Sequence, residues 1–262
     1  MKLQLELLPT HLQREFRTRI EAENIQGDFD KLEDNLRSTH TFNYYAAEAA
    51  VFSSRIEGVE IGLDTYIQHK TKGSKATHDQ LQRTDDLYDA YLLARDLKLD
   101  APGIEKVHAL LTRHVLPPAQ QGKLRTSNVY IVTTQGKINY GASAPQQVAE
   151  EMEKFYRDLE RLTTANLSMV EVFYFAALLQ IVFLKLHPFS DANGRMARLL
   201  EKWFLAEKLG KKAWLLPSER AYFEYHLSYA LNIRKPGLEY ESLDYSQILP
   251  FLELLPKSLK LA

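Results

Sequence analysis

The segment His187-Pro-Phe-Ser-Asp-Ala-Asn-Gly-Arg-Met-Ala-Arg198 is a short polar stretch between two strongly apolar ones. Residues 169–186 before it are mostly apolar, and Ser168 with Glu171 three positions later has the pattern of an N-terminal capping box. Pro188 disfavours helical geometry in the residue before it, which predicts that this helix ends at His187. A second helix is predicted after the segment, because apolar residues recur there at helical spacing. These residues are Met196, Leu199, Leu200, Trp203 and Phe204.

Similar helical patterns along the chain predict an all-α fold, a helical bundle with one small β-hairpin. Glycine makes up only 11 of 262 residues, below the usual share of about 7%, which suits a helical protein with few turns. Helices are predicted near residues 9–24, 28–38, 41–57, 61–69, 78–97, 102–115, 145–163, 168–186, 194–209, 217–233 and 244–260. The loop at Thr71–Thr77 indicates a boundary. We therefore expect an N-terminal helical region (1–75), a core (76–235) and a C-terminal packing helix (236–262).

The charges of the segment indicate an anion-binding site. A helix N-terminus carries partial positive charge and unpaired N–H groups, yet Arg195 and Arg198 lie in or near the first turn of the second predicted helix. A phosphate chain would resolve this conflict, because arginine can donate two hydrogen bonds to phosphate oxygens. Asp191 could hold a magnesium ion on those phosphates. His187, with a pKa near neutrality, could accept a proton from an attacking hydroxyl.

Each of these residues also has a purely structural interpretation. His187 could be a cation that stabilises a helix C-terminus. Asp191 or Asn193 could be an N-cap, and Arg198 could pair with Glu201 on its own helix. The combination of residues in one segment favours the functional interpretation.

The segment resembles the signature of the Fic family, His-Pro-Phe-x-(Asp/Glu)-Gly-Asn-Gly-Arg-x-x-Arg. It differs at Ala192, where the family usually has glycine. Doc-type toxins of the family also have Ala-Asn here, but with lysine in place of Gly194. The matching residues are His187, Pro188, Phe189, Asp191, Asn193, Gly194, Arg195 and Arg198.

The resemblance implies protein AMPylation, in which AMP passes from ATP to a Tyr, Thr or Ser hydroxyl of a target protein and pyrophosphate is released. It implies that His187 is the general base, that Asp191 is the Mg²⁺ ligand, and that Arg198 contacts the terminal phosphate. Residues 192–195 (Ala192, Asn193, Gly194, Arg195) would form the anion hole. A tyrosine pair often lines the adenine pocket in this family, and Tyr225 is the corresponding candidate here.

A second motif resembles the inhibitory signature of Fic proteins, (Ser/Thr)-x-x-x-Glu-(Gly/Asn). It comprises Ser53, Glu57 and Gly58 and lies at the end of the helix predicted for 41–57. A carboxylate near a helix C-terminus has the unfavourable sign for the helix dipole. The resemblance implies that Glu57 pairs with Arg198 and blocks productive ATP binding.

A hairpin is predicted around residues 122–140, where β-branched and aromatic residues flank a Gly-containing turn. Its position resembles that of the Fic flap, which holds the target segment by strand addition. The flap residues predicted to contact a target are Val132, Thr133, Thr134 and Gln135.

The composition of the chain argues against several classes of partner and chemistry. The net charge is −1 and cysteine is absent, which argues against nucleic-acid binding, disulfides and thiol catalysis. Glu171 and Lys185 interrupt the most apolar segment, and the N-terminus lacks a long apolar run, so we predict a cytoplasmic protein without a membrane span or signal peptide. Self-modification and a homo-oligomer are both compatible with the sequence.

Other activities remain open on the same scaffold. They are Doc-like phosphotransfer, transfer of UMP or phosphocholine, and removal of AMP with Glu57 aligning a water. A further alternative is a catalytically silent nucleotide-binding or interaction module, in which Glu57 and Arg198 form a permanent structural bridge.

Overall fold

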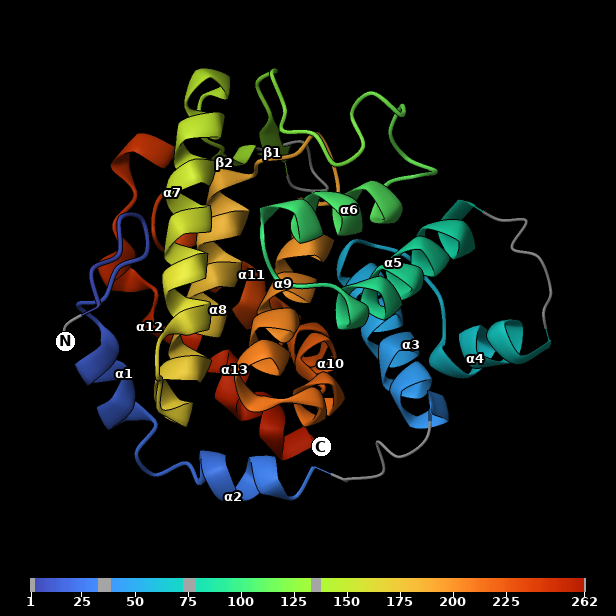
Figure 1. Ribbon diagram of the computed structural model, residues 1–262, viewed down its shortest axis with the longest axis horizontal. Helices are drawn as coiled ribbons and strands as arrows, with labels where there is room; N and C mark the ends of the chain where they lie inside the picture. Colours follow the sequence, from blue (N-terminus) through green and yellow to red (C-terminus); the bar gives the residue numbers. More distant parts are fainter. Residues whose placement is uncertain (1–2, 33–38, 73–78, 133–137, 262) are drawn as a thin grey trace.

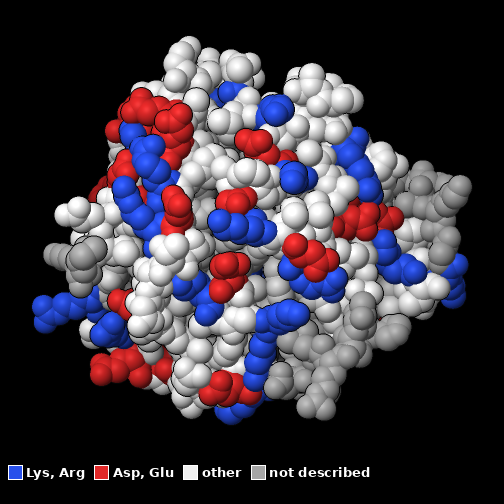
Figure 2. All heavy atoms as spheres, in the orientation of Figure 1, with Lys and Arg blue, Asp and Glu red and all other residues white. Residues whose placement is uncertain are grey.

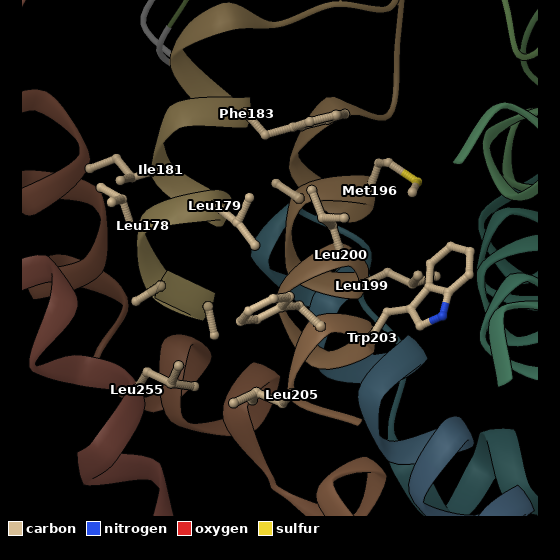
Figure 3. Packing of buried hydrophobic residues seen from close by; sticks show 14 of the residues in the cluster. Leu178, Leu179, Ile181, Phe183, Met196, Leu199, Leu200, Trp203, Leu205 and Leu255 are labelled. Carbon is tan, nitrogen blue, oxygen red and sulfur yellow. The ribbon is translucent and has the colours of Figure 1, made fainter. Parts of the chain in front are cut away.

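Two buried helices, α8 (Met169–Leu186) and α9 (Asn193–Leu209), run side by side through the centre of the computed structural model (Figure 1). The structure describes residues 3–32, 39–72, 79–132 and 138–261. The predicted capping box at the start of α8 is present: Ser168 Oγ accepts from the N–H of Glu171, whose carboxylate accepts from the N–H of Ser168. Apolar side chains from both helices form the centre of the core (Figure 3).

The other helices surround this pair. The N-terminal ones are α1 (Gln13–Arg19), α2 (Ile25–Asp30), α3 (Thr39–Ile56), α4 (Leu63–Lys72), α5 (Asp79–Asp96) and α6 (Ala101–Leu111). α7 (Pro145–Thr164) flanks α8, and α10 (Ser218–Glu224), α11 (His226–Arg234), α12 (Leu249–Leu252) and α13 (Leu254–Lys257) follow α9. Short 3₁₀ turns lie at Lys211–Leu215, Tyr240–Ser242, Tyr245–Gln247 and Ser258–Leu261. The described chain is therefore helical, as predicted, apart from one hairpin.

The hairpin consists of β1 (Tyr130–Val132) and β2 (Ile138–Gly141), which are antiparallel. Tyr130 pairs with Gly141, and Val132 pairs with Ile138 after an irregularity in the register. It lies at the same end of the molecule as α6 and the top of α7 (Figure 1).

α8 is long and apolar enough to cross a membrane by length and composition alone, but 83% of it is buried inside the protein. This burial is what a core helix requires. On the face shown in Figure 2, positive and negative side chains are interspersed, so that face has no extended basic patch.

Four predicted helices differ clearly from those observed. Of the helix predicted at 9–24, only α1 (Gln13–Arg19) is present. The helix predicted at 217–233 is interrupted at Tyr225, which joins α10 to α11 without a proline or glycine. The single packing helix predicted at 244–260 is wrong. Pro250 and Pro256 lie within it, and because proline lacks an N–H and clashes with the preceding turn, the segment forms the short helices α12 and α13. The helix predicted at 28–38 is observed only as α2, and residues 33–38 lie outside the described residues.

Candidate active site

The turn between α8 and α9 is held by its own side chains. Asn193 Oδ1 accepts from the N–H of Phe189 at 2.9 Å, and Asn193 Nδ2 donates to the carbonyl of Phe189 at 2.8 Å. α9 begins at Asn193, so the first N–H groups of the helix have no carbonyl partner within it. They lie at the cavity that Ala192, Gly194 and Arg195 line, as an anion site requires.

Two non-glycine residues of this turn have left-handed backbone geometry. His187 has φ 53° and Ala192 has φ 61°. An L-residue in this region costs about 1–2 kcal/mol, and such strain persists only where the surroundings impose it. Ala192 therefore adopts the conformation for which glycine would be favoured.

His187 is placed to act as a base. Its Nδ1 lies 3.3 Å from the carbonyl of Leu184, which favours the tautomer with the proton on Nδ1 and leaves Nε2 as the basic nitrogen. Burial, together with the nearby positive charge of Arg125, lowers the pKa of His187 to about 4, although the Leu184 carbonyl, Glu57 and Asp191 oppose the shift. The imidazole is therefore neutral near pH 7 and able to accept a proton.

Arg125 holds the end of α8, a role that the sequence did not reveal. Its side chain is buried, and it donates to the carbonyls of His187 (Nε, 2.7 Å) and Leu186 (Nη2, 3.3 Å). It also donates to the carbonyls of Ser127 (2.8 Å) and Ser143 (2.5 Å), on either side of the hairpin. A cation at a helix C-terminus is favourable, so one side chain fixes His187 relative to both ends of the hairpin.

His108 supports the other side of the turn and was also missed. The N–H of Gly122 donates to its Nδ1 at 3.0 Å, so the ring proton must be on Nε2, which donates to the carbonyl of Asp191 at 3.1 Å. The ring stacks on Phe189, with centroids 3.7 Å apart. Burial lowers the pKa of His108 to about 4, which maintains the neutral form that both hydrogen bonds require.

Asp191 is the residue that could hold a divalent cation. Its Oδ1 accepts from the N–H of Ala192 and lies 3.5 Å from Nη2 of Arg195. The side chain is about half exposed and lines the cavity. The part of the chain that the structure describes contains no group of three or more His, Cys, Asp or Glu suited to a metal ion. One carboxylate supplemented by phosphate oxygens is nevertheless a donor set that magnesium accepts.

Glu57 and Arg198 meet, as the resemblance implied. Arg198 Nη2 lies 2.5 Å from Glu57 Oε1. Ser53 also binds this guanidinium, because its Oγ accepts from Nε at 2.8 Å and its carbonyl accepts from Nη2 at 3.1 Å. Although burial alone would raise it, the positive charge of Arg198 holds the pKa of Glu57 below its usual value. Gly58 ends this segment with φ 86°, a conformation that favours glycine.

The carboxylate of Glu57 lies between two cavities. The larger, about 320 Å³, is lined mainly by the α8–α9 turn and by Arg83. The smaller, about 180 Å³, is lined by Arg198, by apolar residues of α3 and α8, and by α11. Glu57, His187 and Gly194 line both. A methyl group on Gly194 would overlap Oε1 of Glu57, so the carboxylate lies directly on the turn.

Residues 98–205 match the model of the Fic/DOC family. This segment, which contains the α8–α9 turn, is similar to that family. Over 134 residues it is 28% identical to "Protein adenylyltransferase Fic" of Drosophila erecta, and over 83 residues it is 35% identical to "Protein adenylyltransferase fic-1" of Caenorhabditis briggsae. These matches cover 51% and 32% of this chain but only 25% and 15% of the relatives, so the chain spans at most a quarter of those proteins.

A crystal structure of a Fic family protein from Desulfovibrio desulfuricans has the same fold. The TM-score is 0.77 at 19% sequence identity, and the alignment covers 99% of this chain and 75% of that one. The similarity therefore extends over the N-terminal helices, which lie outside the range that the family model matches.

Within this fold most, but not all, of the predicted site residues lie together. One group converges around the two cavities: Ser53, Glu57, His187, Asp191, Ala192, Asn193, Gly194, Arg195 and Arg198. Gly58 lies directly beyond Glu57. Val132 is the last residue of β1, and Thr133, Thr134 and Gln135 lie outside the described residues.

Tyr225, the predicted base-contacting residue, is exposed at the junction of α10 and α11 and lines neither cavity. The α11 residues His226, Tyr229, Ala230 and Ile233 line the smaller cavity instead. Because α10 ends at Glu224 and α11 begins at His226, a single continuous helical pattern could not place the α11 residues that line this cavity.

Proposed function

We propose that this protein transfers AMP from ATP to a hydroxyl side chain of a target protein and that Glu57 inhibits the transfer. The observation that carries the proposal is the neutral His187 beside the N-terminus of α9, in one cavity with Asp191 and Arg195. Such a transfer needs a general base, a site for the phosphate anion and a carboxylate that can bind a metal ion. The names of the sequence relatives, protein adenylyltransferases, support this activity.

The residues have distinct roles in the proposed mechanism. The smaller, mostly apolar cavity takes the adenine base, and the N–H groups of the 192–195 turn with Arg195 and Arg198 bind the phosphates. Asp191 would hold Mg²⁺ on phosphate oxygens, where the ion supplies charge neutralisation. His187 Nε2 takes the proton as the target oxygen attacks the α-phosphorus. The bond from the α-phosphorus to the bridging oxygen breaks, and pyrophosphate leaves.

Inhibition follows from the position of Glu57. Its carboxylate lies at the junction of the two cavities and binds the guanidinium of Arg198. A nucleotide with its base in one cavity and its phosphates in the other would therefore meet a fixed negative charge. Like charges at such short range are strongly unfavourable. ATP can bind productively only when this carboxylate moves away.

A target segment would be presented beside His187 by the hairpin. Strand addition uses main-chain hydrogen bonds and tolerates varied sequences. Arg125 donates hydrogen bonds to carbonyls on both sides of the hairpin and to the carbonyl of His187. It therefore fixes the distance between the hairpin and the imidazole of His187. A Tyr, Thr or Ser hydroxyl of another protein, or of this one, would be the acceptor.

The test is a transfer assay with Mg²⁺ that compares ATP labelled at the α-phosphate with ATP labelled at the γ-phosphate. Wild type, Glu57→Gly and the Glu57→Gly/His187→Ala double variant are incubated alone and with lysate proteins. We expect protein label from the α-position only, strongest in Glu57→Gly and lost in the double variant. Label from the γ-position would indicate phosphotransfer, and absence of label from either would refute the proposed activity. Mass spectrometry of labelled peptides then identifies the modified side chain.

A further inference from the structure

Arg83 lies on α5, outside the segment that the family model matches, yet it lines the larger cavity. It shares that cavity with His187, Asp191 and Arg195. It does not line the smaller cavity, where the base is expected. Arg83 is therefore on the phosphate side of the candidate site.

The present bonding of Arg83 is weak. Its Nη2 lies 3.1 Å from Oδ2 of Asp79 one turn earlier on α5, and the two side chains are 41% and 64% exposed. Such an exposed ion pair contributes little to stability. The Nε of Arg83 is shielded from solvent and has no hydrogen-bond partner among the residues that the structure describes. An unsatisfied buried donor is unfavourable, so this guanidinium can exchange Asp79 for a stronger acceptor at little cost.

The positive charges around the larger cavity also favour the binding of an additional anion. Arg83 and Arg195 face Glu57 and Asp191 across the larger cavity, while Arg198 is buried against Glu57. When Glu57 moves away, Arg83 and Arg195 remain in this cavity with Asp191 as the only carboxylate. Arg198, which lines the smaller cavity, then loses its carboxylate partner. Burial and the positive charges of Arg198 and Arg83 lower the pKa of Arg195, which shows that these cations act on one another. An anion with several charged oxygens would relieve this repulsion.

We propose that Arg83 binds the β- and γ-phosphates of a bound nucleoside triphosphate, and hence the departing pyrophosphate. This inference rests on the proposed function, because it needs a nucleotide whose base enters the smaller cavity. Arginine binds phosphate through two parallel N–H donors, and Arg83 Nε is the donor now without an acceptor. Arg83 thereby distinguishes triphosphates from AMP: it holds the part of ATP that AMP lacks.

The experiment is equilibrium binding by calorimetry of ATP and of AMP to the Glu57→Gly/His187→Ala protein, in which the site is open and turnover is prevented. Adding Arg83→Gln should weaken ATP binding about tenfold or more, the loss typical of a charge-assisted hydrogen bond, and change AMP binding by less than twofold. Arg95→Gln is the matched control, because it removes the same charge from the same helix outside the cavities. Asp79→Asn should leave ATP binding unchanged or strengthen it.

The outcomes separate the two proposals. An unchanged affinity for ATP, or equal losses for ATP and AMP, would overturn the role of Arg83 while leaving the proposed function intact. A loss in Arg95→Gln as large as that in Arg83→Gln would reduce the effect to general electrostatics and also overturn it. Absence of ATP binding by the parent double variant, folded by circular dichroism, would overturn both proposals. The transfer assay with Glu57→Gly tests the function independently of Arg83.

Discussion

His108, buried beside the α8–α9 turn, predicts that the protein loses stability in acid. Its Nδ1 accepts from Gly122 and its Nε2 donates to Asp191, so a second ring proton would place two donors face to face. Burial lowers the pKa of His108 to about 4, although its hydrogen bond to the Asp191 carbonyl opposes the shift. The unfolded chain has an ordinary histidine pKa of about 6.5. Below that pH the unfolded state binds a proton that the folded state rejects, so the free energy of unfolding falls as the pH falls.

The size of the effect follows from the two pKa values. Between pH 7 and pH 5, linkage predicts a loss of about 2 kcal/mol from this one side chain. His108→Phe preserves the stacking on Phe189 but cannot titrate. It should lower stability at pH 7 through the two lost hydrogen bonds, and its stability should then fall less steeply with pH.

Urea unfolding at pH 7, 6 and 5 measures the difference in unfolding free energy between wild type and His108→Phe. We expect that difference to shrink by about 2 kcal/mol over this range. His187 has a similarly lowered pKa, but it is present in both proteins and cancels in the comparison. Parallel curves for the two proteins would refute the reasoning, because His108 would then titrate alike in the folded and unfolded states.

Three further changes test other contacts of the site. Ser53→Ala removes the hydroxyl that accepts from Arg198 and should raise AMP transfer, though less than Glu57→Gly does in the same assay, because the carboxylate contact remains. Arg125→Gln should destabilise the protein by about 3 kcal/mol or more, since several carbonyls lose a charged donor, and hydrogen exchange should quicken in the hairpin. Gly194→Ala should displace the Glu57 carboxylate; a double-mutant cycle with Glu57→Gln should therefore show coupling of about 1 kcal/mol or more in urea unfolding.

The sequence identified those site residues whose local position conflicted with helix electrostatics. Arg195 and Arg198 near a helix N-terminus and Glu57 near a helix C-terminus are each unfavourable alone, and the structure places Glu57 against Arg198. The boundaries of α8 were also predictable, because the capping box and Pro188 are local signals.

The supporting residues could not be found in the same way. Arg125 and His108 act on the turn across 62 and 83 positions of sequence, and neither conflicts with its local helix or loop. The position of Tyr229 in the smaller cavity was not predicted, because α11 begins after Tyr225 and no proline or glycine in the sequence marks that break. Contacts that depend on how distant segments pack leave no trace in local periodicity.

The position of Glu57 connects these observations to regulation. Its carboxylate pairs with Arg198, and this ion pair joins the end of α3 to α9. Under the proposed function, triphosphate oxygens would compete with Glu57 for the same cations. If the proposed function holds, a substitution that weakens the contact between Glu57 and Arg198 should raise AMP transfer, and one that weakens triphosphate binding alone, at Arg83, should lower it.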